Sequence, residues 1–173
     1  VEGLSDMLQG SSRPGHFRGV TTIVAKLLGL VRPDFAVFGW KDAQQLIIVE
    51  RMVRDLELGT EIVGAPTARD ADGLAASSRN AMLDADARQR ALAIPRGLAA
   101  ARAMVEAGER SSGKVKEAAR RALAEPGGLE VDHVEVVDAR TLSPLETPKG
   151  PALLLVAARV ERHGGPPVLL IDN

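Results

Sequence analysis

Hydrophobic residues near the start of the chain follow two different spacings. Between residues 20 and 31 they recur every three or four positions, which predicts a helix with one buried face. Arg32-Pro33-Asp34 should end this helix, because the residue before a proline is disfavoured in helical geometry. The run Phe35-Ala36-Val37-Phe38 is wholly apolar, which is typical of a strand that is buried on both faces.

A second helical pattern follows Gly39, and a second apolar run follows that pattern. The helical spacing predicts inward-facing side chains at Leu46, Val49, Met52 or Val53, and Leu56. The run Glu61-Ile62-Val63-Gly64 is typical of a strand. A strand, a helix and a strand in succession form a βαβ unit, so the two strands should be parallel.

Beyond Pro66 the apolar spacing gives way to a polar stretch. Residues 67–80 carry several charged and hydroxyl side chains, which predicts a long functional loop. Helical spacing resumes near Asp84 and predicts a long helix, with a kink or break where Pro95 removes a backbone donor.

The last part of the chain predicts a short helix and three strands. Ser111 or Ser112 should cap the helix, which runs to Leu123. Linkers rich in proline and glycine join the three β-rich runs, which favours an antiparallel meander over residues 131–137, 152–160 and 168–171. Taken together, the elements predict the end of a parallel α/β domain followed by a small α+β domain.

Composition narrows the class of protein. Of 173 residues, 45% are hydrophobic and 26% are charged, which predicts a globular fold. The 22 basic and 23 acidic residues nearly balance, so no positive field favours nucleic acid or an anionic membrane as a partner. The absence of cysteine excludes disulfides, thiolate metal sites and cysteine nucleophiles. No apolar run is long enough to span a membrane, and we expect a cytoplasmic protein.

Two segments at predicted helix starts carry side chains that suit a negatively charged ligand. Arg13-Pro14-Gly15-His16 precedes the first helix, where free backbone N–H groups, a guanidinium and an imidazole can bind an anion. The alternative is an ordinary surface loop. Phe38-Gly39-Trp40-Lys41-Asp42 lies at the carboxyl end of a predicted parallel strand, where open α/β sheets bind ligands.

At that strand end, three side chains suit parts of a nucleotide or an acid. Lys41 suits a phosphate, and Asp42 suits ribose hydroxyls or the cap of the next helix. Gln45, one turn further on, suits a hydroxyl or a carboxylate. The alternative is that Asp42 is only a helix cap, and that Gln44 and Gln45 are only solvated helix surface.

The polar loop ends in Ser77-Ser78-Arg79, whose hydroxyls and guanidinium can clamp a polyphosphate. The alternative is a serine-rich turn before a helix. The preceding Asp70-Ala71-Asp72-Gly73 is either a hinge that carries this clamp over a ligand or a plain β-turn. Neither a Walker loop nor Gly-x-Gly-x-x-Gly occurs, and the three histidines are far apart in the sequence, with His133 expected in a strand.

Four segments, in order along the chain, resemble motifs of the pantothenate synthetase family. They are Ser12-Arg13-Pro14-Gly15-His16-Phe17-Arg18-Gly19-Val20, Phe38-Gly39-x-Lys41-Asp42-x-Gln44-Gln45-Leu46, Ile62-Val63-Gly64-x-Pro66-Thr67, and Asp72-Gly73-Leu74-Ala75-x-Ser77-Ser78-Arg79-Asn80. The closing Leu170-Ile171-Asp172-Asn173 also fits the family. Four motifs in the family's order and at matching intervals make the resemblance specific, and it spans essentially the whole chain.

The resemblance implies an enzyme that uses ATP and Mg²⁺ to join pantoate to β-alanine. Pantoate would first become a pantoyl adenylate with release of pyrophosphate, and the β-alanine amine would then displace AMP. Residues 1–66 would be the C-terminal part of a Rossmann-like, parallel-sheet domain that binds ATP and pantoate. Residues 67–173 would be a small α+β lid domain with a three-stranded antiparallel sheet, carrying the Ser-Ser-Arg loop. A homodimer is also implied, with small molecules rather than nucleic acid or membrane as partners.

The same resemblance implies roles for individual residues. Those expected at the ATP phosphates are Lys41, Ser77, Ser78 and Arg79, and all of these except Ser78 are expected to be catalytic. Gly39 and Asp42 would hold the ribose, and the backbone of Ala68 would contact adenine. Gln45 would hydrogen-bond pantoate, and no residue is expected to bind a metal directly.

Other features concern the edges of this pattern. Arg13 and His16 fall in a family loop expected to lie beside the site. The family's amino-terminal half, with its His-x-Gly-His-type motif, has no counterpart in the 11 residues before Ser12, so we expect part of a longer protein, with an exposed apolar edge and low stability alone. Trp40 stands where the family usually has a glutamate, Ala43 where it has an aromatic residue, and Ala76 where it has a larger apolar residue.

Two other functions fit the same residues. One is another adenylate-forming or nucleotidyltransferase-superfamily enzyme that acts on a different acid. The other is a non-catalytic fragment that serves as a binding or assembly module. Pyrophosphate and AMP release that depends on pantoate and β-alanine separates the first from the family activity, and calorimetry with ATP and magnesium tests the second.

Overall fold

The chain divides into two units in a computed structural model that describes residues 1–173. Residues 1–66 with 140–142 form unit 1, and residues 67–139 with 143–173 form unit 2. No helix in either unit combines the length and the apolar character that crossing a membrane requires.

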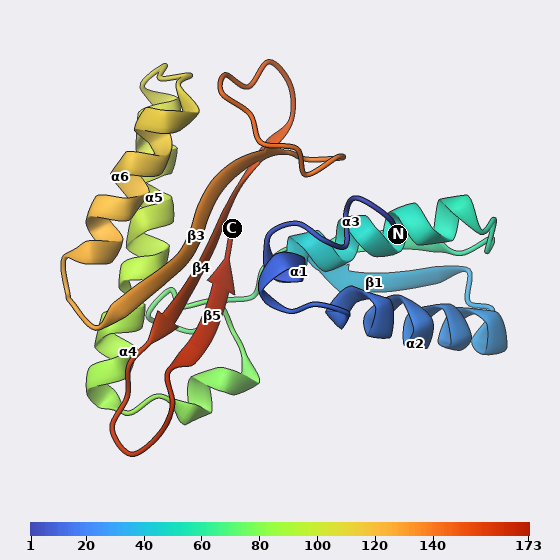
Figure 1. The fold of residues 1–173 in the computed structure, drawn as a ribbon, viewed down its shortest axis with the longest axis horizontal. Coiled ribbons are helices and arrows are strands. Elements are labelled where there is room, and N and C mark those ends of the chain that lie inside the picture. The colour runs from blue at the N-terminus through green and yellow to red at the C-terminus, as the bar shows by residue number, and fades with distance from the viewer. The chain divides into compact units, whose positions relative to one another are not determined.

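Unit 1 is built around a two-stranded parallel sheet. Its elements are α1 (Gln9–Ser12), α2 (His16–Val31), β1 (Phe35–Gly39), the 3₁₀ turn η1 (Trp40–Asp42), α3 (Ala43–Asp55) and β2 (Glu61–Ala65). β1 and β2 pair in parallel from Phe35↔Glu61 to Gly39↔Ala65, which confirms the predicted βαβ unit (Figure 1). Gly15 precedes α2 with a φ of 79°, a conformation that glycine adopts without strain, so the helix begins earlier than the apolar spacing indicated.

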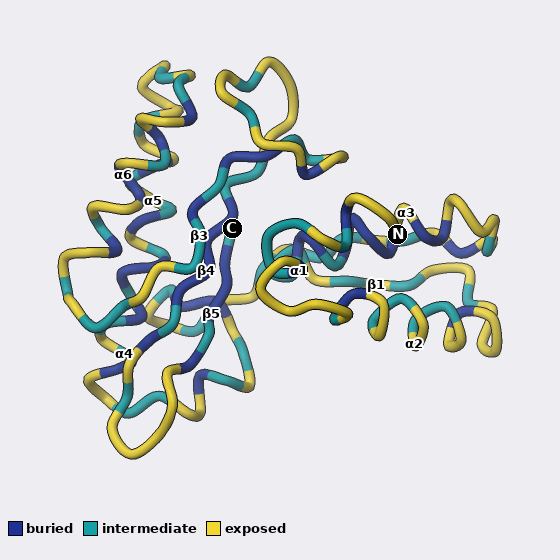
Figure 2. The backbone as a smooth tube through the Cα atoms, viewed as in Figure 1, coloured by how far each residue is buried: buried dark blue, intermediate teal, exposed yellow.

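Only one face of this sheet is covered. Leu28 of α2 packs with Val49 and Met52 of α3, and the cluster extends to Ala36 and Phe38 of β1. Side chains of the opposite sheet face are exposed, and β1 contains no buried residue (Figure 2). The prediction of a strand buried on both faces is therefore wrong, because no element in this unit covers the second face. The exposed apolar residues of unit 1 are Ile23, Leu27, Leu30, Val31, Phe35, Val37, Leu56 and Val63. Leu56, expected to face inward, is exposed because α3 ends at Asp55.

Unit 2 contains the predicted antiparallel meander. β3 (Leu129–Asp138), β4 (Ala152–Val160) and β5 (Val168–Asp172) lie in the order β3-β4-β5, which confirms the prediction. A bulge between Val131 and His133 shifts the β3–β4 register. α5 (Ala93–Glu106) and α6 (Ser112–Ala124) run side by side along the sheet (Figure 1).

The helices of unit 2 bury apolar residues against the sheet. The shared core includes Ile94 of α5, Leu123 of α6, and Val134 and Val156 of the sheet. η2 (Ser78–Met82) and α4 (Ala85–Ala91) precede α5. The helix predicted from Asp84 is broken, as expected, but at Leu92 and not at Pro95. The proline falls in the first turn of α5, where its missing N–H costs no helix bond.

A carboxylate binds the backbone just before α6. Ser111 occupies the N-cap position, as predicted, but its side chain makes no capping hydrogen bond. Glu109 Oε1 instead accepts the backbone N–H groups of Ser111 at 2.8 Å and Arg110 at 2.9 Å. These bonds and the Lys114 ammonium lower the pKa of Glu109 to about 2, since they favour the ionised carboxylate.

Replacing Glu109 by glutamine is therefore expected to lower the free energy of unfolding in a pH-dependent way. Because the pKa of Glu109 is lowered on folding, its contribution is complete above the ordinary value of 4.5 and is lost as the pH falls towards 2. Urea unfolding at several pH values measures the difference between wild type and variant, which should shrink over that interval. Glu117→Gln, at an exposed position of α6, is the matched control. A difference that is independent of pH would contradict the assignment.

Candidate functional site

The predicted strand end of unit 1 forms as a tight junction between β1 and α3. β1 ends at Gly39, η1 carries Lys41, and α3 begins at Ala43, so this segment lies at the carboxyl end of a parallel strand. Asp42 occupies the N-cap position of α3, yet its side chain makes no capping bond. Asp42 thus holds the cap position without using its carboxylate for capping. Gly39 has no neighbouring atom within 4 Å of where a Cβ would stand, which leaves its backbone open to a ligand.

The Trp40 side chain packs against the neighbouring strand. A Cβ added at Gly64 of β2 would lie 2.5 Å from Trp40 Nε1 and 3.2 Å from Leu46 Cδ2. Only glycine at position 64 therefore lets the indole lie against β2. This close approach accommodates the ring of Trp40.

Gly64→Ala is expected to destabilise the protein by about 1–3 kcal/mol, because the added methyl group must displace the indole ring or the backbone. Trp40 is the sole tryptophan, so its emission spectrum should shift with the substitution and report the displacement directly. Gly29→Ala in α2 is the matched control, since a Cβ there meets no atom within 4 Å. Equal emission and equal unfolding midpoints for the two variants would refute the packing constraint.

Gln44, for which the sequence suggested solvated helix surface as an alternative, is a buried structural residue. Its Nε2 donates to the carbonyl oxygens of Leu4 at 3.0 Å and Met7 at 2.8 Å, and its Oε1 accepts the Gln9 N–H at 3.2 Å. It thus fixes the first residues of the chain. The helical position of Gln44 on the face of the buried Ile48 was the signal that could have revealed this. Gln45 points away from that face and is half-buried.

The Arg13–His16 segment joins α1 to α2. Arg13 is exposed at the end of α1, and His16 is the first residue of α2. The His16 ring lies 4.9 Å from the Phe17 ring, between centroids. No side chain caps α2, so the N–H groups of its first turn are not used by a capping residue.

The Ser77–Arg79 segment in unit 2 is held against the sheet. Ser77 is the N-cap of η2, and its Oγ accepts the Arg79 N–H at 3.2 Å. Arg79 Nη1 donates to the Leu169 carbonyl oxygen of β5 at 3.1 Å. Ala68 is brought to the same segment by the bond from Ala76 N to Ala68 O, 2.8 Å long.

The Asp70–Gly73 segment is a closed turn. Asp70 N donates to Leu74 O at 2.8 Å, Gly73 N donates to Asp70 O at 2.9 Å, and Arg69 and Ala75 form an antiparallel bridge. The loop is therefore a small hairpin, which favours the β-turn over the hinge. The predicted site residues thus lie in two groups: Arg13, His16, Gly39, Lys41, Asp42 and Gln45 in unit 1, and Ala68, Ser77, Ser78 and Arg79 in unit 2.

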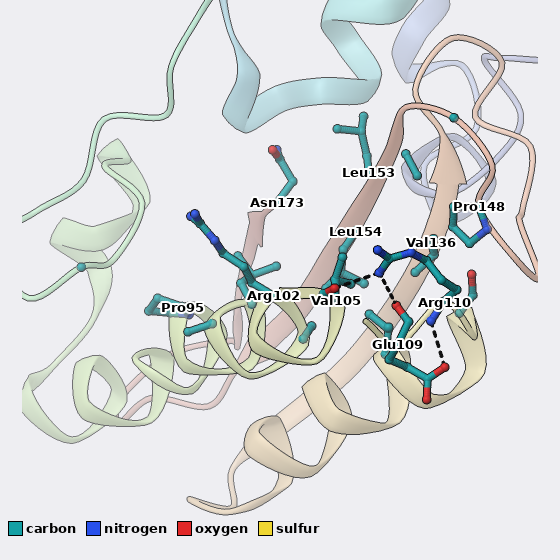
Figure 3. A pocket seen from close by; sticks show the side chains of 18 of the residues that line it. Pro95, Arg102, Val105, Glu109, Arg110, Val136, Pro148, Leu153, Leu154 and Asn173 are labelled. Atoms are coloured by element: carbon teal, nitrogen blue, oxygen red, sulfur yellow. Dashed lines mark hydrogen bonds between the residues drawn. The ribbon is translucent and has the colours of Figure 1, made fainter. Parts of the chain in front are cut away.

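The main cavity of unit 2 is separate from these residues. It has a volume of about 770 Å³ and lies between α5, α6 and the sheet (Figure 3). Its wall is largely apolar, and Arg110 lies across one side, where its Nη1 donates to the carbonyl oxygens of Val105 at 2.8 Å and Glu109 at 2.9 Å. None of the predicted site residues lines it.

Neither unit contains three or more histidine or acidic side chains grouped to hold a metal ion. His133 lies in β3, as expected, with its Nδ1 3.4 Å from Asp132 Oδ2. Burial lowers the pKa of His133, and the Asp132 carboxylate partly opposes that shift.

Comparison with known proteins identifies the origin of these motifs. The family model for pantoate-beta-alanine ligase matches residues 1–173. The chain belongs to this family. Among curated relatives, the pantothenate synthetase of Heliobacterium modesticaldum is 46% identical over 173 residues, which are the whole of this chain and 60% of that protein. The pantothenate synthetase of Myxococcus xanthus is 54% identical over 160 residues, or 91% of this chain and 54% of that protein.

Solved structures of the family share the fold. Pantothenate synthetase from Thermus thermophilus matches with a TM-score of 0.93 and 42% identity, over 99% of this chain and 60% of that one. Pantoate-beta-alanine ligase from Francisella tularensis, complexed with beta-gamma ATP and β-alanine, matches with a TM-score of 0.66 and 25% identity, over 98% of this chain and 54% of that one. The chain thus spans 60% or less of the length of these relatives.

Proposed function

We propose that the complete protein containing this chain is a pantoate–β-alanine ligase. The observation that carries the proposal is the match of the family model to all 173 residues. The protein would condense pantoate with β-alanine at the expense of ATP, releasing pyrophosphate and AMP. A cytoplasmic location and a homodimer belong to the same proposal. Sedimentation of the complete protein tests the homodimer.

The proposed reaction needs positioning and charge stabilisation more than a strong base. A pantoate carboxylate oxygen attacks the α-phosphorus of ATP, and the bond to pyrophosphate breaks. The β-alanine amine then attacks the acyl carbon, the bond to AMP breaks, and the amine loses a proton. The carboxylate is already in its reactive form and β-alanine reacts as its unprotonated amine, so alignment and neutralisation of the developing phosphate charge supply most of the acceleration.

Residues of this chain have chemistry that suits each part of the substrates. Lys41 and Arg79 would bind the ATP phosphates together with the hydroxyls of Ser77 and Ser78. Gly39 and Asp42 would hold the ribose, which fits the absence of a capping bond from Asp42. The Ala68 backbone would contact adenine, and Gln45 would bind pantoate. Arg13 and His16 would lie in the loop beside this site.

Magnesium would enter with the nucleotide. The chain offers no group of three or more acidic or histidine ligands, so Mg²⁺ would be held chiefly by the ATP phosphates, as it commonly is at sites of this kind. The metal would neutralise phosphate charge, and the residues of this chain would orient the phosphates around it.

The test measures two partial reactions in the complete protein. Exchange of radiolabelled pyrophosphate into ATP should require pantoate, and AMP release should require β-alanine in addition. Exchange that depends on a different acid would instead identify another adenylate-forming enzyme. For the 173-residue chain we expect weak or no turnover, restored when the remaining part of the protein is supplied; ATP–magnesium binding to the chain can be followed by Trp40 emission or calorimetry.

A further inference from the structure

An arginine holds the turn that precedes the Ser-Ser-Arg segment. Arg88 of α4 donates from Nε to Asp72 Oδ2 at 2.7 Å and from Nη2 to Asp72 Oδ1 at 3.1 Å. The same Nη2 donates to Asp70 Oδ2 at 2.7 Å. The guanidinium lowers the pKa of both aspartates, so both are ionised at neutral pH. Arg88 therefore fixes both ends of the turn to α4.

A second arginine ties the start of the same hairpin to the end of the chain. Arg69 Nη1 donates to Asp172 Oδ2 at 2.6 Å and Nη2 donates to Asp172 Oδ1 at 3.0 Å, across 103 positions of sequence. The Asp172 side chain is only 1% exposed, whereas that of Arg69 is 34% exposed. Arg69 Nη1 also donates to Gly73 O at 3.1 Å, which links β5 to the turn itself.

The other end of the hairpin is fixed as well. Asn80 Nδ2 donates to Asp70 Oδ2 at 3.1 Å and to Ala75 O at 3.0 Å, and the Asn80 side chain is buried. The neighbouring Arg79 donates to Leu169 O of β5. The segment that ends in Arg79 and Asn80 is therefore attached both to β5 and to the turn. Few backbone arrangements of residues 77–79 satisfy all of these bonds.

We propose that Arg69, Arg88 and Asp172 are positioning residues that hold Ser77–Arg79 in one geometry for the nucleotide phosphates. The proposal rests on the proposed function for its catalytic consequence. None of the three needs to contact substrate. Arg88 acts through the turn, and the pair of Arg69 and Asp172 acts through the turn and β5. The Ser-Ser-Arg segment then moves with unit 2 as a rigid part of it and does not close on a hinge at Gly73.

The test uses the complete protein with Arg88→Gln, Arg88→Lys and Asp172→Asn. Amide hydrogen exchange of residues 70–79 should accelerate in Arg88→Gln, with the rest of unit 2 unchanged. The rate constant kcat for pantoate-dependent pyrophosphate exchange should fall about 100-fold, as expected for a misplaced catalytic group, while KM for pantoate changes little. Arg88→Lys keeps the charge but loses the bidentate fork, and should recover part of kcat. Asp172→Asn should give the same pattern through Arg69.

The control is Arg102→Gln, which removes an exposed pair with Glu106 in the same unit and should leave both readouts unchanged. Faster amide exchange in Arg88→Gln with normal kcat would overturn the positioning role. Unchanged amide hydrogen exchange in all three variants would show that these residues do not hold the segment in place. If the wild-type protein shows no pantoate-dependent pyrophosphate exchange, the proposed function fails. Amide hydrogen exchange then still decides whether Arg69, Arg88 and Asp172 hold the segment in place.

Discussion

Arg79→Ala and Lys41→Ala, each introduced into the complete protein, are expected to slow pantoate-dependent pyrophosphate exchange by about 100- to 1,000-fold, the usual effect of removing a charge-stabilising donor. Negative charge builds on the transferred phosphate and on pyrophosphate as the bond between them breaks. A cation held in place beside these oxygens stabilises that charge more than it stabilises bound ATP. The loss should therefore appear mainly in kcat, with a smaller change in KM for ATP.

Matched variants distinguish this effect from a general loss of positive charge. Arg121→Ala and Lys149→Ala remove exposed cations outside the predicted site and should leave the exchange rate unchanged. Arg79→Lys should recover only part of the rate, because an ammonium cannot reproduce the planar fork that donates to Leu169 O. Rates equal to wild type in both alanine variants would refute the roles assigned to Lys41 and Arg79.

Local patterns in the sequence predicted the secondary structure of both units. Apolar spacing identified the βαβ unit and the meander, because strand and helix periodicities depend on near neighbours along the chain. Pro95 signalled the helix break for an equally local reason. The motif around Lys41 was correctly expected at a strand end, although its ligand contacts stay a prediction.

The side-chain contacts that the sequence did not predict depend on partners that the local pattern of residues does not specify. The Arg69–Asp172 pair spans 103 positions, and no periodicity encodes it. Solvated helix surface was the alternative for Gln44, whereas its side chain is buried by bonds to the distant Leu4 and Met7. Ser111 occupies the expected N-cap position of α6 without a side-chain capping bond, and the Glu109 carboxylate accepts N–H bonds just before the helix.

Replacing Leu27 and Leu30 of α2 by glutamate is expected to have opposite effects on the 173-residue chain and on the complete protein. Leu30 is 80% exposed and Leu27 is 54% exposed, and Phe35 and Val37 of β1 are exposed as well. Exposed large apolar side chains in this number favour self-association. In the isolated chain, the two charges should therefore increase solubility and the monomer fraction in sedimentation.

In the complete protein the same double substitution should lower the free energy of unfolding by about 2–5 kcal/mol, the range for losing a buried aliphatic side chain. The reason is that the additional 40% or more of sequence in the relatives would cover this apolar surface and complete the sheet. Thr22→Glu, an exposed polar position of the same helix, should change neither quantity appreciably. If the double variant left the complete protein as stable as wild type, Leu27 and Leu30 would be exposed in the complete protein as they are in the 173-residue chain. The low stability expected of the 173-residue chain would then need a different cause.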